Sequence, residues 1–157
     1  MESKTVLLFL LSAGCLALLA VSVGGNSWLD VHWLDVHLAT VGLWKNCSEL
    51  TGSCITFEWD WVSSKLHTVR AFAVIAALMA AVATLGSFIR IMRDSDGKAV
   101  SAFFLGAGCC MLIAMAVYTS EYKVQIDYGA EWGWSFILGW IATIGLFVVS
   151  GLTSCLK

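Results

Sequence analysis

The sequence predicts an all-α membrane protein whose four spanning helices carry a small extracellular β-sheet. Of its 157 residues, 59% are hydrophobic and only 13% are charged, so the charges cannot cover a water-soluble fold. They are gathered in short intervals that leave four uncharged runs: Thr5–Leu29, Ala71–Ile89, Ala99–Ser120 and Trp132–Leu156. Each run is long enough for the roughly 20 helical residues that cross about 30 Å of hydrocarbon. We expect one domain over residues 1–157, with spans at about 5–26, 68–90, 99–120 and 133–156.

The first uncharged run has an alternative interpretation as a secretory signal peptide. It follows Lys4 and ends near the small residues of Val21-Ser22-Val23. Its uncharged length exceeds the usual signal-peptide hydrophobic region of about 7–15 residues. We therefore expect a helix that the mature protein retains, and sequencing the mature N-terminus would distinguish the two.

Basic residues predict the orientation in the membrane. Arg90, Arg93 and Lys98 lie close together between the second and third runs. The positive-inside rule makes the loop over residues 91–98 cytoplasmic. Both termini are then cytoplasmic, the loops over 27–67 and 121–132 face outward, and we expect a multi-pass protein of the plasma membrane.

Two cysteines support this orientation. Cys47 and Cys54 are the only cysteines in an outward loop, and an exterior pair in an oxidising compartment predicts a disulfide. The adjoining Asn46-Cys47-Ser48 is a glycosylation sequon, which can be used only if it is exterior. We expect Asn46 to be glycosylated.

The outward loops have the composition of short strands. Between residues 27 and 67, β-branched and aromatic residues alternate with turn signals at Gly42 and Thr51-Gly52-Ser53, which predicts three or four strands. Polar and apolar residues alternate over Lys123–Tyr128, which predicts one more. Seven of the eight tryptophans lie in or beside these loops, where we expect them to anchor the exterior part at headgroup level.

A doubled pentapeptide, WLDVHWLDVH, occupies Trp28–His37. In an unbroken strand the second copy would present its apolar residues on the face that the first copy makes polar, because five is odd and strand faces alternate. We therefore predict a bulge or a break within one residue of Trp33-Leu34 that keeps the apolar residues of both copies buried. Four polar residues would then share one solvated face, a candidate contact surface: Asp30, His32, Asp35 and His37.

The same four residues raise the alternative of a metal site, since Asp and His bind zinc. Residues two apart on an open strand diverge, however, unless a second strand helps. We interpret them as a solvated face and expect no metal.

Several function classes are disfavoured by what the runs lack. They contain no Asp, Glu, Lys, Arg or His, which argues against ion-coupled transport. The chain has no nucleophile with a partner base, phosphate loop or metalloprotease motif, so we expect a non-enzyme without catalytic residues, cofactor or small-molecule substrate. A net charge of −2 without a basic cluster argues against nucleic-acid binding.

Small residues recur at four-residue spacing in every run and predict close helix packing, within the bundle or between molecules. The four stripes are Ala13-Ala17, Ala76-Ala80-Thr84, Ala102-Gly106-Cys110-Ala114 and Ser135-Gly139-Thr143.

Spaced motif residues resemble the claudin superfamily: Trp28, then Gly42-Leu43-Trp44, Cys47, Cys54 and Arg70. Other segments are similar to its peripheral myelin protein, epithelial membrane protein and lens fibre intrinsic membrane protein branch: Val41–Cys47, Val69–Phe72, Val117–Ser120 and Trp134–Trp140. The resemblance implies a left-handed four-helix bundle capped by an antiparallel sheet of about five strands. It also implies that Trp28, Gly42, Leu43 and Trp44 anchor the sheet to the helix ends, with Arg70 a structural residue near them.

Two functions follow as expectations. The first is a junction or adhesion protein whose exterior sheet contacts a like molecule, in the same or the opposed membrane. The second is an accessory subunit that binds other membrane proteins laterally and alters their trafficking or gating. Both involve membrane lipid as a partner.

Overall fold

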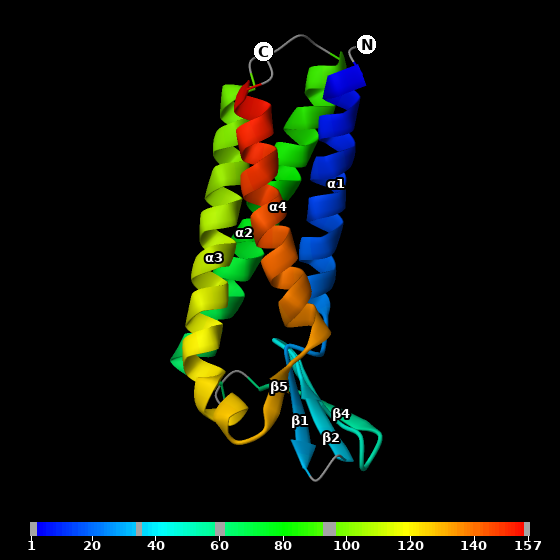
Figure 1. Cartoon of the computed structure of the whole chain (residues 1–157), viewed down its shortest axis with the longest axis vertical. Helices are drawn as coiled ribbons and strands as arrows, with labels where there is room; N and C mark the ends of the chain where they lie inside the picture. The colour runs from blue at the N-terminus through cyan, green and yellow to red at the C-terminus, as the bar shows by residue number, and fades with distance from the viewer. Residues whose placement is uncertain (1–2, 34–35, 59–61, 93–96, 156–157) are drawn as a thin grey trace.

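The computed structural model describes residues 3–33, 36–58, 62–92 and 97–155, which form four long helices and a five-stranded antiparallel sheet (Figure 1). All four helices are long and apolar enough to cross a membrane. They are α1 Ser3–Gly24, α2 Ser64–Met92, α3 Lys98–Asp127 and α4 Trp134–Cys155. The predicted fold class is therefore confirmed.

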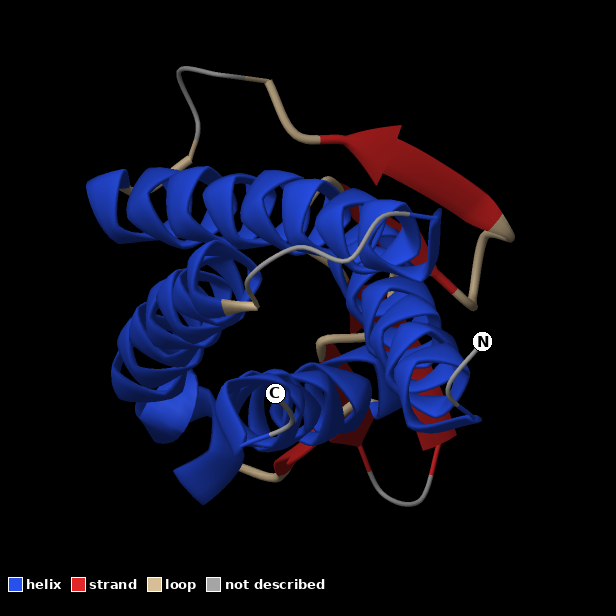
Figure 2. Cartoon of the chain, turned by 90° about the horizontal axis from the view of Figure 1, so that it is seen from above, coloured by secondary structure: helices blue, strands red, loops and turns tan. Residues whose placement is uncertain are grey.

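The helices form a ring in which α1 and α3 each pack against both α2 and α4 (Figure 2). Small residues make this close packing possible, because Ala76 and Ala80 of α2 and Gly139 of α4 are buried in the bundle. The stripes on α2 and α4 thus face the interior. The other two stripes do so only in part, since Ala17 of α1 and Ala102 of α3 are exposed.

Buried serines add polar contacts between the helices. The Ser101 hydroxyl of α3 donates to the Ser150 carbonyl of α4 at 2.9 Å, and the Ser150 hydroxyl donates back to the Ser101 carbonyl at 2.9 Å. The Ser22 hydroxyl of α1 donates to the Ser135 carbonyl of α4 at 2.7 Å. Such bonds hold helices together where lipid supplies no hydrophobic drive between them.

The sheet lies at one end of the bundle, called here the sheet end, and both termini lie at the other (Figure 1). Its strand order is β4-β3-β2-β1-β5. The strands are β1 Leu29–Trp33, β2 Val36–Val41, β3 Lys45–Ser48, β4 Ser53–Thr56 and β5 Ala130–Trp132. Strand β1 runs away from the helices (Figure 1).

The prediction of a strand at Lys123–Tyr128 is wrong, because α3 continues to Asp127 and the fifth strand follows it. Tyr122 stacks on Tyr118 one helical turn earlier, with ring centroids 4.4 Å apart, and this contact favours continuation of the helix. Gly129, at φ +101°, then reverses the chain into β5.

Candidate functional site

The doubled pentapeptide folds as a hairpin. Its first copy ends β1 at Trp33, and β2 begins at Val36, so the predicted break is present. The two strands pair antiparallel, with Trp33 opposite Val36 and His32 opposite His37, and the register shifts between Val31 and His32. Chain reversal thus accommodates the odd repeat, and it places the two histidines of the repeat opposite each other across the ladder.

The polar residues of the repeat share a face as far as the structure describes them. Asp30 and His32 are two residues apart on β1 and so lie on the same face, and the His32 and His37 rings lie 4.7 Å apart. Asp30, His32 and His37 are all half-buried, and Asp30 accepts a hydrogen bond from the Ser27 hydroxyl at 2.7 Å. Asp35 lies outside the described residues. These positions remain a candidate contact face.

Burial of the apolar residues differs from the expectation. Leu29 is buried, but Val36 is exposed at the start of β2, at the end of the sheet away from the helices. Leu34 lies outside the described residues. Among the residues that the structure describes, no group of three or more His, Cys, Asp or Glu could hold a metal ion.

The β3–β4 hairpin carries the disulfide. Cys47 and Cys54 face each other directly across the two strands and are bonded. The neighbouring Asn46 pairs with Val41 on one side and Ile55 on the other, and it is half-buried. Its glycosylation stays a prediction.

Two tryptophans join the sheet to the end of α1. The Trp28 indole N–H donates to the Ser22 carbonyl at 2.7 Å, and the Trp44 indole N–H donates to the Val23 carbonyl at 2.8 Å. Both carbonyls belong to the last turn of α1, where intrahelical donors run out. The indoles therefore cap the helix, and Trp28, which is fully buried, is not the headgroup anchor that we expected.

Arg70 ties α2 to the same junction. Its Nε–H donates to the Leu43 carbonyl at 2.7 Å, and its guanidinium carbon lies 5.1 Å from the centroid of the Trp44 ring. Gly42 fits because a Cβ there would lie 2.7 Å from the Asn26 Cα. The junction thus brings Trp28, Gly42, Leu43, Trp44 and Arg70 together.

An aromatic cluster completes the junction, and we did not anticipate it as a unit. The Trp28 ring contacts Tyr118 of α3 at 4.8 Å and Phe136 of α4 at 5.9 Å between centroids. Phe136 in turn stacks on Trp132 of β5 at 4.3 Å. The sequence places aromatic residues near the sheet ends of the third and fourth uncharged runs. Which of these rings contact one another depends on how the helices pack.

Comparison with known proteins decides the family. The model of the PMP-22/EMP/MP20/Claudin family matches residues 1–153. The chain belongs to this family. Membership supports a four-span membrane protein, in agreement with the four apolar helices.

Relatives from the family align with most of the chain. Human epithelial membrane protein 1 is 29% identical over 96% of this chain and 94% of its own length. Human protein NKG7 is 31% identical over 85% of this chain and 79% of its own. Mouse claudin domain-containing protein 2 is 33% identical over 74% of this chain and 68% of its own.

Proposed function

We propose that this protein organises contact between opposed membranes through its sheet, as a non-enzymatic plasma membrane protein with cytoplasmic termini. The disulfide supports an oxidising environment for the sheet, since such bonds persist outside the cytosol. The basic residues Arg90, Arg93 and Lys98, in and beside the loop over residues 91–98, support a cytoplasmic location for the opposite end.

The observation that carries this proposal is a pair of exposed apolar side chains at one end of the sheet, called here the tip surface: Val36 and Leu50. Leu50 is 72% exposed in the β3–β4 turn, and Val36 is 53% exposed at the start of β2. Val36 begins β2, and the antiparallel register of β2 and β3 puts this start at the same end as the β3–β4 turn.

The position of the tip surface suits contact with another membrane. It lies where the sheet extends beyond the helices, so lipid of the protein's own membrane does not cover it. In addition, β4 is an edge strand with an unpaired side, which can add a further strand. A second copy brings the same surface, and many weak copies across a narrow gap act by multivalency.

We predict that the double change Val36→Ser and Leu50→Ser abolishes most clustering of otherwise non-adherent cells that express the protein, because it removes both apolar side chains of the tip surface. His37→Ala should weaken clustering less, because His37 is partly buried and therefore offers less surface to a partner. Its Nδ1 lies 3.9 Å from Glu49 Oε1. Clustering is counted at equal surface expression. Val124→Ser serves as the control, because Val124 is exposed on α3 outside the tip surface.

Lateral association with other membrane proteins is the second candidate. It is favoured by Gly14 of α1, which is exposed and has no heavy atom within 4 Å of the place that a Cβ would take, as is also true of Gly24. Small residues on a lipid-facing side allow another helix to approach closely. If clustering stays at background while the protein co-purifies stoichiometrically with a channel or receptor, this candidate replaces the first.

A further inference from the structure

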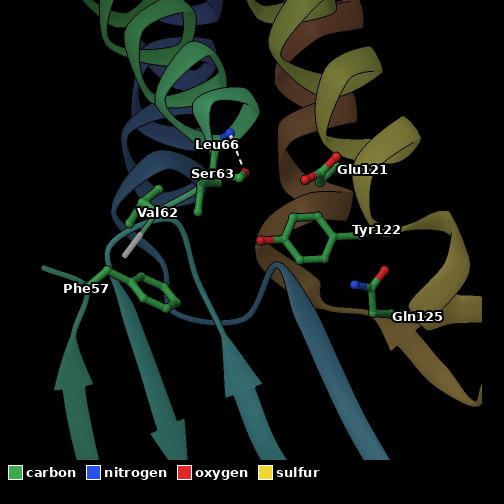
Figure 3. Close-up of a pocket in the computed structure, with 7 residues that line it drawn as sticks. All are labelled: Phe57, Val62, Ser63, Leu66, Glu121, Tyr122 and Gln125. Carbon is green, nitrogen blue, oxygen red and sulfur yellow. Dashed lines mark hydrogen bonds between the residues drawn. The ribbon is translucent and has the colours of Figure 1, made fainter. Parts of the chain in front are cut away.

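A cavity and a pair of histidines bring polar side chains together in the described part of the chain. The cavity, of about 230 Å³, lies between the start of α2, the segment after β4 and the last turns of α3 (Figure 3). Its carboxylate is already paired, because Glu121 Oε2 lies 2.7 Å from Lys65 Nζ. The histidines lie opposite each other on β1 and β2, and histidine is the commonest metal ligand. The histidine pair, rather than the cavity, therefore indicates a ligand.

A bulge brings the two histidines face to face. Over the first three residues of β1 the strands keep one register, which would place Leu38 opposite His32 if it continued. Between Val31 and His32 the register shifts by one residue, so that His37 is opposite His32 instead. Bulges often re-aim a side chain beside a functional site. Here the bulge pairs two metal-ligating side chains where an unshifted ladder would pair His32 with an apolar one.

The two rings are close enough to share one ion. Their centroids lie 4.7 Å apart, and the ring planes are tilted by 58°. Nitrogens that bind the same zinc ion at about 2.0–2.1 Å stand no more than about 4 Å apart, and this centroid separation allows the facing ring edges to meet that limit. Because χ2 of histidine has broad wells, both rings can turn a nitrogen toward one point. Neighbouring residues on a single open strand diverge, but here β2 supplies the second ligand from across the ladder.

The surroundings of the pair also suit a metal. His32 and His37 are half-buried, so an ion can reach the rings while the ladder holds their backbone in place. Glu49 Oε1 lies 3.9 Å from His37 Nδ1. A carboxylate beside one ring nitrogen favours the proton on that nitrogen, and Nε2 then keeps its lone pair for a metal.

We propose that His32 and His37 together bind a zinc ion, at what is called here the two-histidine site. Imidazole nitrogen is a preferred ligand of zinc, whereas magnesium and calcium prefer oxygen. The described residues supply two ligands, and a tetrahedral zinc ion has further positions that water can take. This binding needs no second membrane, so its test is independent of the contact function proposed above.

Calorimetric titration of the purified protein in detergent with zinc chloride tests the proposal. The protein is made without a polyhistidine tag, and its thiols are alkylated first, because Cys109 and Cys155 are exposed and thiolates also bind zinc. We expect saturable binding of zinc but not of magnesium. His32→Gln and His37→Gln should each weaken the apparent zinc affinity at least tenfold, because even the loss of an outer-shell partner typically costs roughly 10–100-fold.

The matched control is His67→Gln, because this third histidine lies on α2 rather than on the ladder. It should keep the zinc affinity of the wild type. Zinc should also raise the Tm of the wild type and of His67→Gln but not that of the two site variants. Without zinc the site variants should have a Tm close to wild type, since both histidines are half-buried on the sheet. Equal zinc affinities in the wild type and both site variants, or no saturable zinc binding by the wild type, would overturn the proposal.

Discussion

Replacing Trp28 with alanine is expected to lower the free energy of unfolding by about 3–5 kcal/mol, the largest effect that we expect of any single change. Trp28 is fully buried, and its ring fills the space between α3 and α4. The change also leaves the Ser22 carbonyl at the end of α1 without its indole donor. We expect a large loss of surface delivery as well as a lower Tm in detergent.

Two further variants separate packing from hydrogen bonding. Trp28→Phe keeps an aromatic ring but removes the indole N–H, so it should cost about 1–3 kcal/mol. Trp134→Ala is the matched control, because Trp134 is an exposed tryptophan at the start of α4. Equal losses of stability from Trp28→Ala and Trp134→Ala would show that the junction is not where the sheet is held.

Gly42→Ala is expected to destabilise the protein by about 1–3 kcal/mol through overpacking. A Cβ at this position would lie 2.7 Å from the Asn26 Cα and 2.8 Å from the Gly25 carbonyl oxygen, which are backbone atoms that cannot rotate away. The segment between α1 and β1 would have to separate from the end of β2. That movement also disturbs Leu43 and Trp44, which follow directly.

The control for Gly42 is Gly24→Ala. Gly24 ends α1 close to the same junction, but no heavy atom lies within 4 Å of the position of an added Cβ. Chemical denaturation of both variants in the same detergent measures the difference. Unchanged stability in Gly42→Ala would mean that the close approach at the junction is not needed for the fold.

The sequence predicted those features that depend on local composition. Four uncharged runs predicted four spans, because hydrocarbon thickness fixes the length of a spanning helix. The odd repeat predicted the strand break at Trp33, because strand faces alternate. Neither inference needed knowledge of tertiary contacts.

Features that depend on distant contacts were missed or misjudged. The alternation at Lys123–Tyr128 suggested a strand, but α3 continues to Asp127, and near this end the Lys65–Glu121 ion pair links it to α2. The tryptophans suggested headgroup anchors, whereas Trp28 and Trp44 cap α1, because its last carbonyls face the folded sheet. The cavity between the start of α2 and the end of α3 could not be predicted either, since the residues that line it are far apart in the sequence.

The central claim is that the sheet joins opposed membranes by contact between like molecules. Its most direct test mixes two differently labelled liposome populations and measures their co-clustering by fluorescence cross-correlation. We predict clustering when both populations carry the protein with its sheet outward, and none when one population is bare. Background cross-correlation with protein in both populations, or equal clustering with bare liposomes, would contradict the claim.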